Sequence, residues 1–103
     1  MIVKIIDYGQ GEVNFVNYLV SGLSKEQLTF LNDNLNEKTT VEGDNLLITL
    51  NFSDKLYPFQ SDVAKFRLDD FISREEIEMN VFLSSFLDKK EGAKYEQIIT
   101  RWT

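Results

Sequence analysis

The first stretch of the chain is apolar and β-branched, and it ends in a glycine-rich turn. Except for one lysine, residues Ile2–Ile6 are all Val or Ile, which is the composition of a β-strand. Asp7–Gly11 follows, and the two glycines in this segment are typical of a tight turn. The pattern therefore predicts a first strand that leads directly into a turn.

The next segment, Glu12–Gly22, combines features of two kinds of element. Its Val, Phe and Tyr residues favour a strand. Its polar residues Asn14, Asn17 and Ser21 are spaced by three and four positions, which places them on one stripe of a helix. Gly22 stands where such a helix would end. We predict a helix here, with a strand as the alternative.

A clearer helix start follows at Ser24. Ser24 and Gln27 have the spacing of a capping box, in which each side chain accepts a hydrogen bond from the backbone N–H of the other residue. Leu28, Leu31 and Leu35 recur at spacings of three and four, so they define one buried face. The sequence therefore predicts a helix that runs to about Leu35.

The middle of the chain has the pattern of strands joined by turns. Thr39–Glu42 and Leu46–Phe52 flank the turn residues Gly43–Asn45, which predicts a β-hairpin. Asp54–Gln60 contains the only proline and is expected to be a loop. Val63–Leu68 alternates apolar and charged residues, as a further strand would.

A second capping box is suggested by Ser73 and Glu76, and the helix that it would start is the longest in the chain. We expect this helix to run to about Lys89 and to be terminated by Gly92. Its apolar residues fall on one broad face and are Met79, Phe82, Leu83, Phe86 and Leu87. The last segment, Tyr95–Trp102, is expected to be a strand or a short helix.

The two capping boxes lie in similar sequences. Leu23–Leu28 resembles Ile72–Ile77, which either records a duplication or reflects the common requirements of helix starts. Strands and helices do not alternate along the chain, so we predict a single α+β domain over residues 1–103. A short antiparallel sheet of four or five strands packs with two or three helices, in the chain order β-α-α-β-β-β-α-β.

The composition excludes several kinds of chemistry. The 103 residues include no Cys and no His, which removes thiolate nucleophiles, imidazole bases and the commonest zinc ligands. We therefore expect a protein that is not an enzyme and uses no cofactor. The N-terminus lacks the pattern of a secretion signal, and no stretch approaches the roughly 18 apolar residues of a membrane span. The expected location is the cytoplasm.

The turn Asp7–Gly11 is the most motif-like segment, because a glycine-rich turn after a strand can bring backbone N–H groups close to a phosphate. Residues Ile5–Gly11 resemble the first strand and turn of the glutamine amidotransferase subunits of histidine biosynthesis. They also resemble the Asp-x-Gly-x-Gly phosphate loop of actin-like ATPases. The first family uses a catalytic Cys and His that this chain lacks, and Glu12 would repel a phosphate. A plain turn is therefore the preferred interpretation.

Acidic residues give the chain a net charge of −6, and many of them gather in its second half. The members of this group are Asp62, Asp69, Asp70, Glu75, Glu76 and Glu78. Glu75 and Glu78 are one helical turn apart and have the ligand type that Mg²⁺ prefers, but no metal-binding loop motif accompanies them. Carboxylates on a rigid surface can also imitate a phosphate backbone and occupy a basic groove. The alternative is an acidic surface that serves solubility.

A few apolar residues of the predicted helices point to a protein partner. Projected at about 100° per residue, Phe30 lies off the leucine stripe of its helix. Ile77 and Val81 lie opposite the apolar face of theirs. Exposed apolar residues recur in contact surfaces, although Phe30 could equally be covered by a strand. We therefore add Phe30 and Val81 to the six acidic residues as candidate partner-binding residues.

In its small size, acidity and lack of catalytic residue types, the chain resembles the inhibitors of the anti-CRISPR type that phages and mobile elements encode. The resemblance rests on general character and assigns no residue. It implies a partner with a basic nucleic-acid-binding channel, such as a CRISPR nuclease, whose binding of guide RNA or DNA would be blocked. Direct binding of bare nucleic acid or of a membrane is not expected from an acidic protein. The alternative is a non-catalytic interaction or assembly module, either a regulatory subunit or a homodimer.

Overall fold

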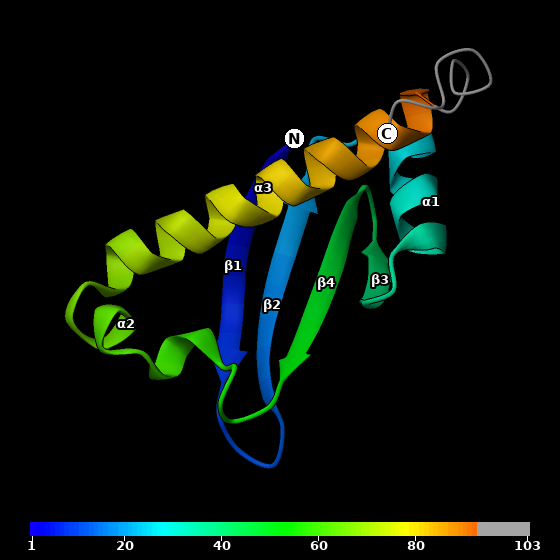
Figure 1. The fold of residues 1–103 in the computed structure, drawn as a ribbon. Helices are drawn as coiled ribbons and strands as arrows, with labels where there is room; N and C mark the ends of the chain where they lie inside the picture. Colours follow the sequence, from blue (N-terminus) through cyan, green and yellow to red (C-terminus); the bar gives the residue numbers. More distant parts are fainter. Residues whose placement is uncertain (93–103) are drawn as a thin grey trace, which may run out of the picture.

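The computed structural model describes residues 1–92 as a four-stranded sheet with three α-helices and a short 3-10 helix (Figure 1). The elements in chain order are β1 (Ile2–Gly9), β2 (Asn14–Ser21), α1 (Lys25–Asn34), β3 (Lys38–Glu42), β4 (Asn45–Phe52), η1 (Pro58–Gln60), α2 (Asp62–Phe66) and α3 (Leu68–Gly92). The strands pair in the spatial order β1-β2-β4-β3, and neighbouring strands are antiparallel. The predicted α+β class is confirmed. The predicted terminal element Tyr95–Trp102 lies outside the described residues.

The segment predicted as a helix, Glu12–Gly22, instead forms the central strand β2. Asn14 and every second residue after it are buried, which is the two-residue period of a strand. The polar residues do not form a solvent-facing stripe. The Asn14 Nδ2 donates to the Asp54 Oδ1 (2.7 Å), and the Asn17 Oδ1 accepts from the Thr49 hydroxyl (2.8 Å). Pairing with β1 and β4 thus decides between the two structures that this sequence allows.

The first capping box is present at the start of α1. The Ser24 Oγ accepts from the Gln27 N–H (3.1 Å), and the Gln27 Oε1 accepts from the Ser24 N–H (3.0 Å). Leu31 is fully buried, while Leu28 and Leu35 pack against the core at its margin. The predicted helix start and its buried face are therefore confirmed.

The predicted hairpin around Gly43 is also present. β3 and β4 pair Thr39 with Ile48 and Glu42 with Asn45, so that a two-residue turn joins the strands. Gly43 has a φ of 63°, a left-handed conformation that glycine adopts without steric cost. The glycine thus explains why the chain reverses at this point.

Two sequence-based predictions for the region between the sheet and the long helix are wrong. Val63–Leu68, predicted as a strand, is mostly the helix α2, whose N-terminus is capped by the Ser61 Oγ accepting from the Ala64 N–H (3.1 Å). α3 begins at Leu68, so Ser73 lies inside a helix and does not cap one. Only the first of the two similar sequences therefore starts a helix, and the element order is β-β-α-β-β-α-α.

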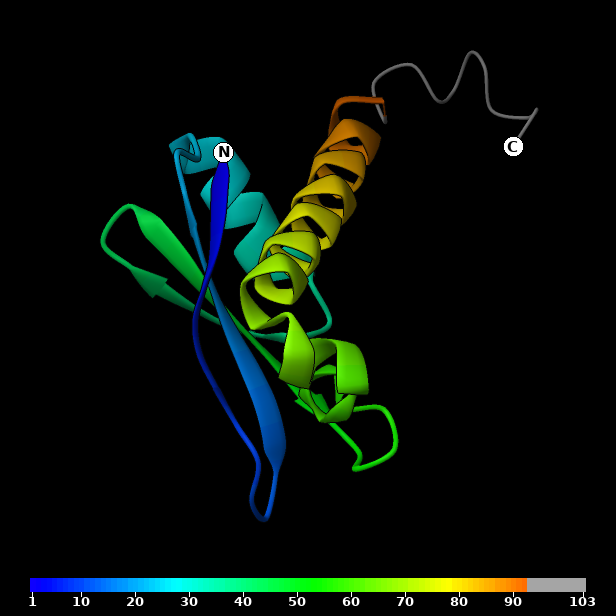
Figure 2. The ribbon, with the colours of Figure 1, turned by 90° about the vertical axis from the view of Figure 1, so that its left-hand side faces the viewer.

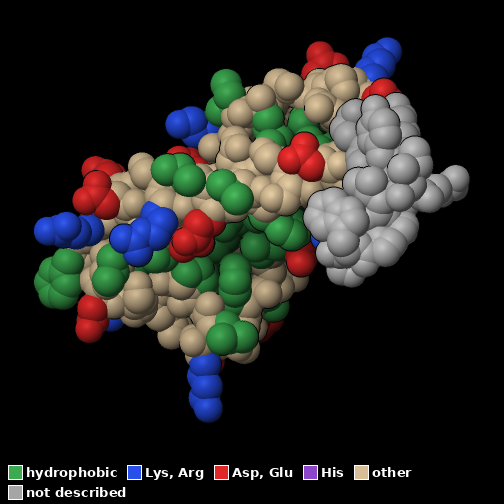
Figure 3. All heavy atoms as spheres, turned by 45° about the horizontal axis from the view of Figure 1, so that its top comes forward, with side chains coloured by type: hydrophobic (Ala, Val, Ile, Leu, Met, Phe, Trp, Pro, Cys, Tyr) green, Lys and Arg blue, Asp and Glu red, His purple; other side chains and the backbone are tan. Residues whose placement is uncertain are grey.

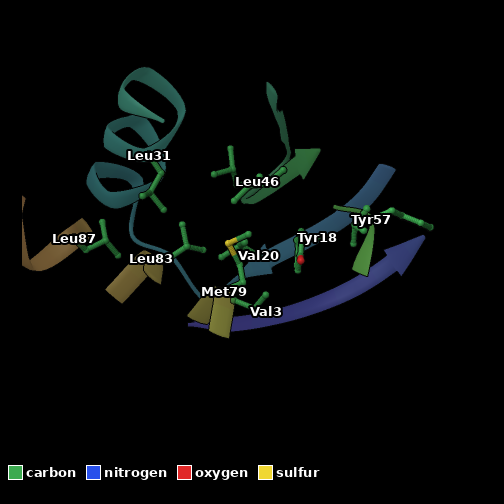
Figure 4. Packing of buried hydrophobic residues seen from close by; sticks show 11 residues of the cluster. Val3, Tyr18, Val20, Leu31, Leu46, Tyr57, Met79, Leu83 and Leu87 are labelled. Carbon is green, nitrogen blue, oxygen red and sulfur yellow. The ribbon is translucent and has the colours of Figure 1, made fainter. Parts of the chain in front are cut away.

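The helices all lie on one side of the sheet (Figure 2). The hydrophobic core fills the space between the two layers, where side chains of the strands meet those of α1 and α3 (Figure 4). From the predicted apolar face of α3, Met79, Leu83 and Leu87 are buried and Phe86 packs at the margin. Phe82 is 51% exposed, so its assignment to the buried face is wrong. The core fixes how α3 lies across the sheet.

Candidate partner-binding groove

The outer edge of the sheet at β1 faces the side of α3. Within residues 1–92, β1 pairs with β2 on one side and with no strand on the other. The Ile5 N–H donates to the Glu76 Oε2 of α3 (2.8 Å), which shows that it points away from β2. Backbone groups of an antiparallel edge strand point alternately inward and outward, so those of Val3 point outward as well. The β1 edge therefore offers backbone hydrogen-bonding groups at Val3.

A groove of about 500 Å³ runs between this edge and α3. α3 begins beyond β1 and crosses above it, so the groove lies along the overhanging part of the helix (Figure 1). Its walls are Met1, Ile2, Val3 and Lys4 from the N-terminal strand and Ser73, Glu76, Ile77, Asn80 and Val81 from α3. The Asn80 Nδ2 donates to the Met1 carbonyl (3.4 Å) and joins the two walls.

Exposed apolar side chains line this groove. Ile77 is 63% exposed and Val81 is 60% exposed. Ile77 and Val81 are four residues apart and therefore lie on one stripe of α3. The exposure expected for Val81 is confirmed. Apolar residues grouped in this way beside a strand edge are typical of a surface that contacts another protein.

A second feature of α3 is the half-buried Glu75, which faces Tyr18 of β2. Burial, followed by the charge of Glu78, raises the pKa of the Glu75 carboxyl above its ordinary value. Burial, followed by the charges of Glu75 and Glu78, also raises the pKa of the Tyr18 hydroxyl. Glu75 is therefore a partly buried group on the side of α3 that faces β2.

The structure does not bring the six predicted acidic residues onto one surface. Asp62 is in the first turn of α2, and Asp69 and Asp70 are exposed in the first turn of α3. Glu78 is exposed, whereas Glu75 faces inward and Glu76 binds β1. On the face shown in Figure 3, acidic and basic side chains are interspersed among hydrophobic ones. Within the described part of the chain, no three carboxylates are grouped closely enough to hold a metal ion.

The remaining candidate, Phe30, lies at the margin of the core. Its ring centroid is 5.5 Å from that of Phe86, and its side chain is half-buried against the hydrophobic cluster. α3 thus partly covers Phe30, the residue that the projection placed off the buried leucine stripe of α1. Phe30 lies apart from the groove, whose lining residues do not include it.

Sequence reasoning missed most of the groove, namely the N-terminal strand edge and the residues Ser73 and Asn80. The signal for the helix wall was present, because Ser73, Ile77 and Val81 recur every four positions. No local signal marks β1 as an edge strand, since that property depends on the order of all four strands.

The fold and the groove define a two-layer α+β domain with an open strand edge beside an apolar helix stripe. The chain belongs to the family of unknown function DUF5750, whose model matches residues 2–89. The match includes all four strands and every residue that lines the groove except Met1. No match was found among curated proteins. Within the described residues, no helix is both long enough and apolar enough to cross a membrane.

Proposed function

We propose that this protein is a non-catalytic, cytoplasmic protein-binding domain that takes an extended segment of its partner into the groove between β1 and α3. The observation that carries the proposal is the open edge of β1 beside the exposed stripe of Ile77 and Val81. An extended segment can add to such an edge as a further strand. Main-chain hydrogen bonds at Val3 then supply affinity, and contacts with α3 supply specificity.

The overall charge of the chain favours a basic segment. The net charge is −6, and Asp69, Asp70 and Glu78 are exposed on α3, whereas the groove walls themselves carry one lysine, Lys4, and one glutamate, Glu76. Complementary charge speeds encounter and selects among partners more than it adds affinity. The expected segment therefore alternates apolar residues, which face Ile77 and Val81, with Lys or Arg.

Glu76 sets one end of this binding surface. Its carboxylate already accepts from the Ile5 N–H and so takes the place that a carbonyl of an added strand would have. Edge strands are often protected in this way against unspecific pairing. A bound segment therefore pairs at Val3 and ends, or turns away, before Ile5.

Selection from a displayed library of short random peptides, followed by calorimetry, tests the proposal. Basic, partly apolar peptides are expected to be enriched. The double variant Ile77→Ser, Val81→Ser lacks the apolar stripe, so the affinity of these peptides for it should be lower by about tenfold or more. The matched control is Val63→Ser, because Val63 is a similarly exposed helical valine (49%) outside the groove. Failure to enrich any sequence, or equal binding to all three proteins, would contradict the proposal.

A second candidate function is inhibition of a nucleic-acid-processing protein with a basic channel. It is favoured by the net charge and by the exposed carboxylates of Asp69, Asp70 and Glu78. The test compares the protein with its Asp69→Asn, Asp70→Asn, Glu78→Gln variant in affinity capture from a bacterial lysate. A nuclease that only the parent protein retains, that has lost its RNA or DNA and that elutes with salt would support inhibition. Retention of the same proteins by both would refute it.

A further inference from the structure

The sheet has a second face, opposite the helices, that no other element of residues 1–92 covers (Figure 2). Strand register fixes which side chains share this face, because alternate residues of each strand lie on it. Leu19 of β2 pairs with Leu47 of β4, and both are only partly exposed. Lys4 and Thr40 extend this row to the two edges. The centre of the open face is therefore apolar.

Phe15 adds to this apolar surface in a way that explains Gly9. The two residues are paired across β1 and β2. A Cβ at Gly9 would lie 2.6 Å from a ring carbon of Phe15, so the ring occupies the space above the glycine. A larger residue at position 9 would push the ring away. The glycine-rich turn thus begins with a residue that serves packing on the open face.

The next row of the open face carries opposite charges at its two ends. It consists of Asp7 on β1, Asn17 on β2, Thr49 on β4 and Lys38 on β3. A shift in register between Ile5 and Asp7 brings Asp7 onto this face. The Thr49 hydroxyl donates to the Asn17 Oδ1 (2.8 Å) and joins the two uncharged polar side chains in the middle of the row. Charge is therefore left only at the edges.

We propose that this open face binds a second copy of the chain, with the two sheets packed face to face around a two-fold axis parallel to the strands. Such an axis, placed between β2 and β4, exchanges β1 with β3. It sets Asp7 opposite Lys38 of the second copy, and the same pair recurs on the other side of the axis. Leu19 then meets Leu47 of the second copy. One face is thus complementary in charge and apolarity to itself.

The area of the face suits a weak dimer. Three strands of eight residues and one of five, spaced by about 4.8 Å with about 3.3 Å per residue, present roughly 460 Å². Two copies bury about 900 Å², which lies between the usual size of a lattice contact and that of a stable complex. Sheets that pack in this manner keep their strands within about 30° of one another. The interface does not depend on the proposed function, because the groove lies on the side of the helices.

Sedimentation equilibrium of the full chain and of charge-reversed variants tests the dimer. The parent protein is expected to dimerise, and Asp7→Lys or Lys38→Asp should each weaken the dimer by about tenfold, because two attractive pairs become repulsive. The double variant Asp7→Lys, Lys38→Asp should restore association. Asp33→Lys changes an exposed charge on α1, outside this face, and should have no such effect.

Circular dichroism of each variant separates loss of association from loss of folding. Asp7 and Lys38 are both exposed, so the single variants should retain the parent spectrum. A parent protein that stays monomeric at millimolar concentration would overturn the proposal. Weakening that the double variant does not reverse, or that Asp33→Lys reproduces, would overturn it as well.

Discussion

The hydrogen bond from the Ile5 N–H to the Glu76 carboxylate gives the sharpest prediction for a single residue. It joins α3 to the edge of the sheet across 71 positions of sequence and is partly buried. Hydrogen bonds to charged groups contribute about 1.5–3 kcal/mol, and partial exposure reduces this value. We therefore expect Glu76→Ala to lower the free energy of unfolding by about 1–2 kcal/mol. The corresponding fall in Tm is roughly 4–8 °C per kcal/mol for a small domain.

Urea unfolding followed by circular dichroism measures this loss, and amide exchange locates it. The matched control is Glu78→Ala, because Glu78 is an exposed glutamate of the same helix and the change in helix propensity is the same. Exchange of the Ile5 amide should accelerate in Glu76→Ala and stay unchanged in Glu78→Ala. Equal stability of the two variants together with unchanged Ile5 exchange would refute the reasoning.

Three further predictions concern the core, the helix starts and pH. Leu83→Ala should cost about 2–5 kcal/mol in urea unfolding, and Phe82→Ala, on the exposed side, under about 1 kcal/mol; equal costs would contradict the assigned face of α3. Ser24→Ala should cost about 1 kcal/mol and Ser73→Ala under about 0.5 kcal/mol in thermal unfolding, because Ser24 caps α1 whereas Ser73 lies inside α3; a larger cost for Ser73→Ala would contradict these helix starts. The folded state raises the pKa of Glu75 above 4.5, so it binds the proton more tightly than the unfolded chain does. Stability should therefore fall as pH rises from 4.5 through the raised pKa, and Glu75→Gln should abolish this fall; a variant that parallels the parent from pH 4 to 7 would exclude it.

Features that depend on neighbouring residues could be predicted from the sequence. The capping box of Ser24 and Gln27 is complete within four residues, and within residues 1–23 no helix precedes it to extend through Ser24. The hairpin at Gly43 likewise needs only a turn and two flanking strands. Both segments carry their own hydrogen-bonding partners, which is why local pattern was enough.

Features that depend on distant partners could not be predicted. β2 has a polar spacing compatible with a helix, and only its pairing with β1 and β4 makes it a strand. The second predicted capping box does not start a helix, because α3 already starts at Leu68 and continues through Ser73. A residue that would cap a helix in isolation is then simply inside one.

The candidate site likewise combines features that the sequence predicts with features that it does not. Projection of the long helix placed Ile77 and Val81 on its exposed side without knowledge of the fold, and the structure bears this out. The acidic residues around them were grouped by sequence distance alone. Glu75 and Glu76 in fact turn toward the sheet, because the path of α3 across β1 directs this side of the helix inward. Acidic residues that are close in the sequence therefore need not share one surface of the folded protein.

In the proposed complex, a partner segment adds to the β1 edge as a strand beside Ile77 and Val81. Amide exchange of Val3, measured with and without a peptide enriched by selection, tests it most directly. Strand addition places a hydrogen bond on the outward Val3 N–H, so its exchange should slow by about tenfold or more in the complex. The Lys4 amide, which pairs with β2, serves as the internal control and should change little. Binding that leaves the Val3 amide as accessible as in the free protein would contradict the account.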